Sequence, residues 1–201
     1  MSDLAPDSIA SWHRRICPIT DWLLISGDLP SRPVDAFTKL HEWLEAGVTD
    51  IVDVRGEWSD ARLVARLAPH VRYHYLGTHD DGTEQDEDWF QAGIDALRIA
   101  QQHEDSVTMV HCHMGVNRGP SMAFAYLLDQ GWDPIEALTA IRSARPIAGI
   151  IYAPDAIRAL APVLTERGLD IDVVNREVDE WFDRNDIDIA TIIRRIRVAN
   201  D

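Results

Sequence analysis

A short apolar run at residues 107–110 leads through eight residues into a helix that begins at Gly119 and is almost wholly apolar. A run of this kind is typical of a buried central strand, and a helix that is apolar on all sides is buried as well. The connecting residues, 111–118, read His-Cys-His-Met-Gly-Val-Asn-Arg. This segment restricts the chain to folds that bury a strand and the following helix in one core.

The rest of the chain alternates between the two kinds of element. The other predicted strands are residues 12–16, 22–25, 50–54 and 71–76. The other predicted helices run from Pro33 to Gly47, over 59–67, over 89–102, from Asp133 onward, and over 156–167. Alternating strands and helices predict an α/β fold with a central, mostly parallel sheet flanked by helices.

The chain of 201 residues is most simply one domain with a short appendage. We expect a frayed N-terminus over 1–11, a main domain over 12–168 and a helical C-terminal extension over 169–201. The extension is predicted to form two helices that separate near Asn185 and Asp186. Ile192, Ile193 and Ile196 are expected to pack on the core, with a dimer or partner surface as the alternative.

Composition excludes several classes of function. The formal net charge of −15 argues against binding to nucleic acid or to an anionic membrane, because both need clustered Lys and Arg. No apolar run approaches the roughly 18 residues of a membrane helix, and residues 1–10 lack the basic start of a secretory signal. The two cysteines, Cys17 and Cys112, make no disulfide framework, so we expect a cytoplasmic protein.

The loop before Gly119 has the chemistry of an anion site. A short loop that closes onto a helix N-terminus directs several backbone N–H groups into one concavity, where the helix dipole also favours negative charge. Arg118 can reach two oxygens of a phosphate with its fork of donors, and Gly115 permits a tight turn. The loop residues predicted to bind the anion are His113, Met114, Gly115, Val116, Asn117 and Arg118.

The same surroundings act on Cys112. A thiol at a helix N-terminus beside an arginine is expected to have a pKa below about 8.5. Cys112 would then be a thiolate near neutral pH and a good nucleophile. One loop would therefore bind a phosphate and present the attacking sulfur to it.

The segment resembles the His-Cys-x5-Arg signature of the cysteine-dependent protein tyrosine phosphatases. Its residues from Val110 to Arg118 are similar to those of the dual-specificity branch in particular. Residues 25–28, Ile-Ser-Gly-Asp, resemble the opening of that catalytic domain, and Arg145-Pro146 resembles its closing segment. The resemblance implies the phosphatase-like α/β fold and a catalytic domain over 12–168. It implies hydrolysis of phosphotyrosine, and of phosphoserine or phosphothreonine, in a phosphorylated protein through a phosphocysteine intermediate. We expect no metal and no cofactor, and the oligomeric state is not predicted.

The resemblance also implies an aspartic acid on an upstream loop that protonates the leaving group. Asp80 lies 32 residues before Cys112 and is the preferred candidate, and Asp81 is the alternative. His111 is expected to orient the loop and tune the thiol. The family usually has Ser or Thr directly after the arginine, where this chain has Gly119 and Pro120, so Ser121 is the candidate donor to the cysteine sulfur.

Other functions stay open at this point. A sulfurtransferase or an arsenate reductase also places a cysteine in an anion-binding loop, although Cys17 has no visible partner motif for a resolving thiol. A phosphoprotein-binding pseudophosphatase is the alternative that needs no catalysis. The interior of the loop holds no Lys or Arg, which argues against phosphoinositides, and the acidic loop over 80–88 disfavours polyanionic substrates.

Overall fold

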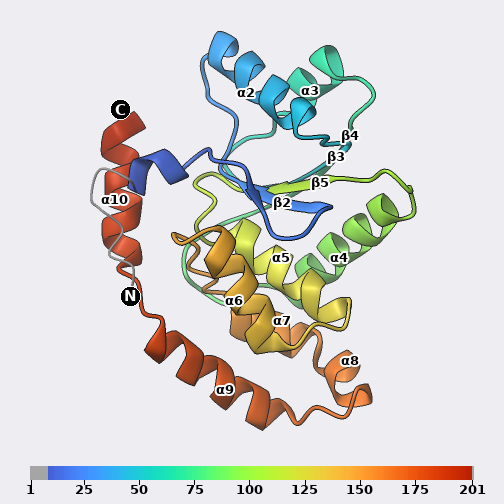
Figure 1. Cartoon of the computed structure of the whole chain (residues 1–201), viewed down its shortest axis with the longest axis vertical. Helices are drawn as coiled ribbons and strands as arrows, with labels where there is room; N and C mark the ends of the chain where they lie inside the picture. The colour runs from blue at the N-terminus through green and yellow to red at the C-terminus, as the bar shows by residue number, and fades with distance from the viewer. Residues whose placement is uncertain (1–8, 201) are drawn as a thin grey trace.

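The computed structural model describes residues 9–200 and is built around a five-stranded sheet with helices on both faces (Figure 1). The strands are β1 (Cys17–Pro18), β2 (Leu23–Ser26), β3 (Asp50–Arg55), β4 (Arg72–Thr78) and β5 (Thr108–His111). Their order is β1-β2-β5-β3-β4, and only the β1–β2 pair is antiparallel. The predicted fold class is confirmed. The run at 107–110 is the central strand, because β5 lies between β2 and β3.

Two layers of helices cover the sheet. One face carries α2 (Pro33–Glu45) and α3 (Ala61–Leu67), whose buried residues pack with Ile51 and Met109. The other face carries α4 (Glu87–Gln101), α5 (Arg118–Asp129), α6 (Pro134–Ala144), α7 (Ala153–Ala159) and α8 (Ala161–Glu166). Every residue of α5 from Arg118 to Leu128 is buried, which explains why its sequence has no polar face.

Two predicted elements are wrong. The strand over 12–16 does not form: η1 (Ala10–Trp12) is a 3-10 helix, and only Cys17 and Pro18 pair with β2. Proline has no backbone N–H, so the edge ladder ends there. The helix over 156–167 is divided into α7 and α8, because Pro162 has no N–H and its ring would clash with the carbonyl of Arg158. The frayed segment falls largely on residues 1–8, which lie outside the described residues.

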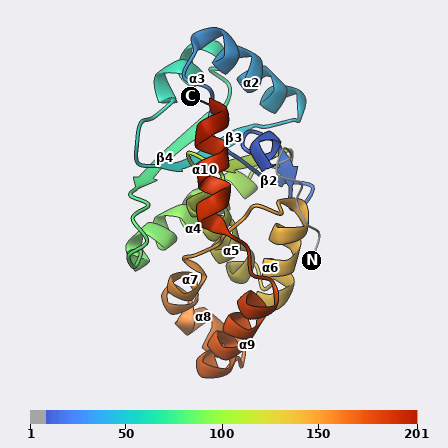
Figure 2. The ribbon, with the colours of Figure 1, turned by 90° about the vertical axis from the view of Figure 1, so that its left-hand side faces the viewer.

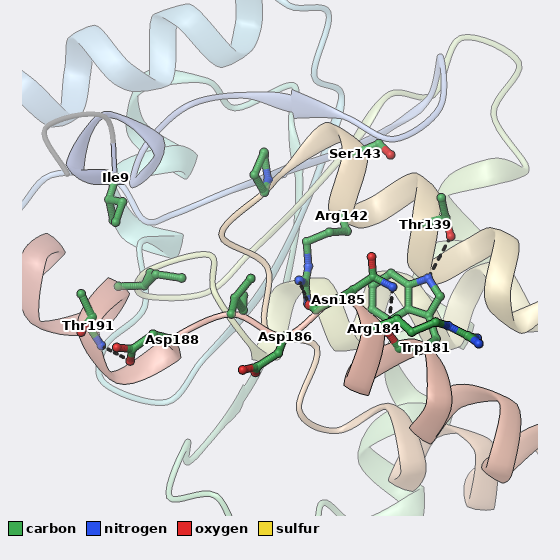
Figure 3. Close-up of a pocket in the computed structure, with 13 residues that line it drawn as sticks. Ile9, Thr139, Arg142, Ser143, Trp181, Arg184, Asn185, Asp186, Asp188 and Thr191 are labelled. Atoms are coloured by element: carbon green, nitrogen blue, oxygen red, sulfur yellow. Dashed lines mark hydrogen bonds between the residues drawn. The ribbon is translucent and has the colours of Figure 1, made fainter. Parts of the chain in front are cut away.

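The C-terminal extension forms α9 (Ile171–Arg184) and α10 (Ile189–Asn200), as predicted. The indole of Trp181 packs on α6, where its Nε1 donates to Thr139 Oγ1 at 3.1 Å (Figure 3). The Arg142 guanidinium lies 5.2 Å from the centre of that ring and donates to the Asn185 carbonyl at 2.7 Å. These contacts border a cavity of about 580 Å³ and hold the chain where it leaves α9.

Helix α10 passes in front of one end of the sheet, next to the loop that follows β5 (Figure 2). Ile192 and Ile196 pack with Val116 of that loop and with Ile147. The expected packing is therefore confirmed for Ile192 and Ile196 but not for Ile193, which is partly buried and lines a cavity, and the domain boundary at 168 stays a prediction. Within residues 9–200, no helix is both long enough and apolar enough to cross a membrane.

Candidate active site

The loop from Cys112 to Asn117 connects the central strand to the buried helix α5. Gly115 has a φ of +64°, a conformation that costs other residues energy. A Cβ at Gly115 would lie 2.7 Å from the carbonyl oxygen of Ser26 and would also strike the Arg145 guanidinium. The tight turn expected at Gly115 is confirmed, and only glycine fits it.

Arg145 supports this loop from behind. It is fully buried, its Nε donates to the Gly115 carbonyl at 2.6 Å, and its Nη2 donates to the Met114 carbonyl at 3.1 Å. The C=O and N–H of a planar trans peptide point in opposite directions. The amides that follow these carbonyls, those of Gly115 and Val116, are therefore directed away from Arg145 and toward the interior of the loop. Arg145 was predicted from the sequence only as part of the resemblance at Arg145-Pro146, and this role was not predicted.

Cys112 lies at the base of the loop and is 1% exposed. Burial raises the pKa of its thiol, whereas the charge of Arg118 and the amides of Gly119 and Gly115 act to lower it. The net shift is upward, because burial outweighs the favourable groups. The expectation of a lowered thiol pKa is therefore wrong for the arrangement seen in this structure.

Arg118 is paired with groups outside the loop. Its Nη1 donates to Glu57 Oε2 at 2.9 Å and to the Thr78 carbonyl at 2.8 Å, and its Nη2 donates to Glu57 Oε1 at 2.8 Å. Burial would raise the pKa of Glu57, but the hydrogen bonds and charge of Arg118 hold that pKa below its ordinary value. Glu57 is thus an anion paired with Arg118, whereas the carboxylate that acts to raise the pKa of Cys112 is that of Asp80.

Glu57 was not among the predicted site residues. It follows β3, and β3 is the parallel neighbour of β5. The carboxyl ends of neighbouring parallel strands meet at one edge of a sheet, which is the signal that would have placed it near the cysteine loop.

Asp80 lies at the mouth of the loop. Its Oδ2 is 3.2 Å from Nε of Arg118, and its Oδ1 accepts hydrogen bonds from Nδ2 of Asn117 at 2.8 Å and from the hydroxyl of Tyr152 at 2.9 Å. Burial raises the pKa of Tyr152 to about 12, so this phenol stays a hydrogen-bond donor at neutral pH. Sequence reasoning found Asp80 and missed Tyr152, for which it had no motif.

Asp81, the alternative acid, has different surroundings. Its carboxylate accepts hydrogen bonds from the backbone and side chain of Thr83 in the same loop, and these lower its pKa. It lines the cavity next to Asp80, but within residues 9–200 it makes no hydrogen bond or ion pair with Arg118 or with the cysteine loop. The geometry favours Asp80 as the candidate acid.

Asn117 connects several parts of the site. Its Oδ1 accepts from the backbone N–H of Ile151 at 2.7 Å and from the hydroxyl of Ser121 at 3.2 Å. Ser121 is fully buried, and its oxygen also accepts from the N–H of Tyr152 at 3.3 Å. In this structure the Ser121 hydroxyl therefore donates to Asn117, and its proposed bond to the cysteine sulfur stays a prediction.

The two histidines that flank the cysteine face different surroundings. His111 is buried against the Trp43 ring at 5.2 Å, and burial lowers its pKa, so it is neutral near pH 7. His113 is half-buried, and its Nδ1 is 2.7 Å from Oδ2 of Asp28. His113 thus ties the loop to the segment after β2, whereas His111 packs toward α2.

A cavity of about 270 Å³ opens over the cysteine loop. Cys112, Arg118, Glu57 and Asp80 line its charged part. The rest of its wall comes from Asp81, Gly82, His113, Met114, Val116, Asn117, Ile151, Ile189, Ile193 and Arg197. All predicted site residues line this cavity except Gly115, His111 and Ser121.

Comparison with known proteins shows which fold this chain has. No family model and no curated protein matches the sequence. A mouse putative dual specificity phosphatase complexed with zinc tungstate matches with 20% identity and a TM-score of 0.62, covering 76% of this chain and 90% of that chain. PTPMT1 in complex with PI(5)P matches with 19% identity and a TM-score of 0.60, covering 79% and 99%.

The chain has the dual-specificity phosphatase fold. The same fold occurs in the human tyrosine phosphatase-like serine/threonine/tyrosine-interacting protein, at 17% identity and a TM-score of 0.59, covering 75% of this chain and 99% of that one. The resemblance read from His-Cys-x5-Arg is confirmed at the level of the fold. About a quarter of this chain lies outside each of these alignments, so the phosphatase fold carries additional structure here.

Proposed function

We propose that the protein is a cysteine-dependent phosphatase that hydrolyses phosphomonoesters in proteins, phosphotyrosine and also phosphoserine or phosphothreonine. The observation that carries the proposal is the arrangement around Arg118. This arginine follows the loop that presents Cys112, and its Nε lies 3.2 Å from the carboxylate of Asp80. A nucleophile, an anion-binding arginine and an acid therefore line one cavity.

In the first step, the Cys112 thiolate attacks phosphorus and the bond from phosphorus to the leaving oxygen breaks. Arg118 and the loop amides hold the other three phosphoryl oxygens. Asp80 gives its proton to the leaving oxygen, because a phenolate or alkoxide leaves poorly at neutral pH. The products of this step are a phosphocysteine and a free alcohol or phenol.

In the second step, water attacks the phosphocysteine and the bond between sulfur and phosphorus breaks. Asp80, now a carboxylate, takes the proton from that water, and inorganic phosphate leaves. Asn117 and Tyr152 both donate to Oδ1 of Asp80, so they hold this base in place. The thiolate is restored and the cycle closes.

The charge of Asp80 acts on the Cys112 thiol. As a carboxylate, Asp80 is one of the groups that raise the pKa of Cys112. An acid that carries its proton has no such charge, so a protonated Asp80 favours the thiolate. The proposed active form thus has one proton on Asp80 and none on Cys112, and that form suits the first step.

The charge at the mouth of the cavity supports a phosphoprotein as substrate. Glu57, Asp80 and Asp81 line the cavity, and they would repel a substrate with several phosphates. PTPMT1 was solved with PI(5)P, but the charged residues that line the cavity here are three acids beside the arginines Arg118 and Arg197. A phosphorylated side chain with one phosphate fits this balance of charge better.

A phosphoprotein-binding module without turnover is the second candidate. Two observations favour it: burial raises the pKa of Cys112, and a tyrosine phosphatase-like interacting protein has the same fold. Such a module would bind phosphate at Arg118 and release it unchanged.

Hydrolysis of para-nitrophenyl phosphate between pH 5 and pH 8 separates these candidates. The wild type should release phosphate, and acid quenching during turnover should trap one phosphate per chain on Cys112. Cys112→Ser should be inactive, since an alcohol is a far weaker nucleophile, while Cys17→Ser should keep most of the activity. A folded, reduced wild type that binds phosphopeptides but releases no phosphate would favour the binding module. Equal activity of wild type and Cys112→Ser would reject both cysteine chemistry and the proposal.

A further inference from the structure

Helix α10 supplies one wall of the cavity over Cys112. Ile189, Ile193 and Arg197 line this cavity. They are four residues apart in sequence, and residues at this spacing form one stripe along a helix. The cavity is therefore closed on one side by a segment far from the cysteine loop in sequence.

A neighbouring stripe of α10 fixes the helix to the body of the protein. Ile192 and Ile196 are buried with Val116 and Ile147. At the far end of the helix, Arg14 Nη1 donates to Oδ1 of Asn200 at 2.7 Å. At the near end, a Cβ on Gly149 would lie 2.9 Å from Cδ1 of Ile189, so α10 lies directly against the backbone there. The wall is built into the fold: Ile189 both lines the cavity and packs against the anchoring cluster, whereas Ile193 lines the cavity and is not part of that cluster.

The lining beyond the phosphate site is apolar. Ile151 projects from the segment before α7 and is 43% exposed, and Ile189 and Ile193 line the same cavity from α10. The volume of about 270 Å³ exceeds the roughly 150 Å³ that holds a benzene molecule in a protein interior. A ring and its phosphoryl group fit in this space, whereas a phosphoserine would leave the apolar walls without a partner.

Resting on the proposed function, we propose that α10 is the specificity wall of the site. Ile189 and Ile193, together with Ile151, bind the ring of an aryl phosphomonoester and make the protein prefer phosphotyrosine to phosphoserine. The aryl ring gains apolar contact that an alkyl chain of one carbon cannot make, and the loss of such contact in a pocket changes rates by about 10- to 200-fold. Arg197, at the exposed end of the stripe, marks the outer rim.

The test compares two peptides of one sequence, one with phosphotyrosine and one with phosphoserine, by kcat/KM. Ile193→Ala should lower the ratio of the two values at least about tenfold, with the loss on the phosphotyrosine peptide alone. Ile193→Gln, which keeps the length of the side chain, should act in the same direction. Val198→Ala is the matched control, because Val198 lies on the same helix and is 73% exposed. Circular dichroism and thermal unfolding check that each variant is folded.

Two outcomes would overturn the specificity wall. One is an unchanged ratio in folded Ile193→Ala, with or without an equal loss on both peptides, and the other is a gain on both peptides, which would make α10 an obstruction. If the wild type hydrolyses neither peptide, the proposed catalysis is wrong. Calorimetry of peptide binding to Cys112→Ser then tests the specificity wall separately. The proposal for α10 is supported if Ile193→Ala in that background weakens phosphotyrosine-peptide binding about tenfold and leaves phosphoserine-peptide binding unchanged. It is contradicted if neither peptide binds better than the other.

Discussion

The side-chain amide of Asn117 donates to Oδ1 of Asp80 at 2.8 Å, which ties the cysteine loop to the acidic loop. The same asparagine accepts from the N–H of Ile151 at 2.7 Å. A residue inside the candidate phosphate loop therefore positions the candidate acid and the segment before α7 together.

Replacement of the candidate acid should slow catalysis according to the leaving group. We expect Asp80→Asn to lower kcat for a phosphotyrosine peptide about 100-fold or more, since general acid catalysis contributes about 10²- to 10⁴-fold. The loss should be smaller for para-nitrophenyl phosphate, whose phenolate leaves without a proton. Asp81→Asn is the matched control and should change kcat less than twofold. The reverse order of the two variants would assign the acid to Asp81.

Removal of the same charge should make Cys112 more acidic. The carboxylate of Asp80 raises the pKa of the thiol, so its loss in Asp80→Asn must lower that pKa. The rate of alkylation by iodoacetamide, followed from pH 5 to pH 10, should show its midpoint at lower pH in the variant. Cys17→Ser in both backgrounds removes the second thiol from the measurement. A midpoint that stays in place would contradict the coupling proposed for the two groups.

The buried arginine behind the loop should be important for stability and for anion binding. Arg145→Met leaves the carbonyls of Met114, Gly115 and His13 without this donor, at about 1–3 kcal/mol for each buried group. We expect unfolding in urea to show that the free energy of unfolding falls by about 3 kcal/mol or more. Inorganic phosphate should stabilise the variant less than it stabilises the wild type. Arg98→Met removes a half-exposed ion pair with Asp129 and should change stability by only about 0–1 kcal/mol. Similar losses in the two variants would count against a special role for Arg145.

Acid should destabilise the fold through Asp28. Burial raises the pKa of this carboxyl, but hydrogen bonds from His113 and His13 and the charge of Arg14 outweigh burial and hold the pKa well below its ordinary value. A carboxyl with a depressed folded pKa adds stability above its unfolded pKa, about 3.9, and that stability is lost as pH falls below it. Urea unfolding should therefore show Asp28→Asn less stable than wild type at pH 6, with the difference shrinking from pH 4 to pH 2.5. A difference that is constant over this range would show that Asp28 acts by packing alone.

The cysteine loop and its surroundings were predictable to different degrees. The strand, the loop and α5 are contiguous, so their apolar pattern and the Cys-x5-Arg spacing identified Cys112, Arg118 and Gly115 directly. Asp80 was found because its distance along the chain matched a known pattern. Glu57, Tyr152 and Arg145 belong to three other segments, and only the tertiary fold brings them to the loop.

The thiol pKa was mispredicted for a related reason. The loop sequence contains Arg118 and the helix N-terminus, both of which favour a thiolate, but it does not contain Asp80 or the side chains that exclude water from Cys112. Burial and a distant carboxylate are properties of the assembled fold. The position of α10 was open in the same way, since its isoleucines fit either a core face or a partner surface.

Because the proposed nucleophile and arginine lie within residues 111–118, the proposed acid is Asp80, and one wall of the cavity is formed by α10, mutation can act on the proposed chemistry and on this wall independently. Changes at Ile189 or Ile193 leave the nucleophile, the arginine and the acid untouched. Descendants of this protein could therefore acquire new substrates through a few substitutions near the C-terminus, while the reaction itself is inherited intact. A laboratory library confined to the stripe of α10 that lines the cavity would follow the same route.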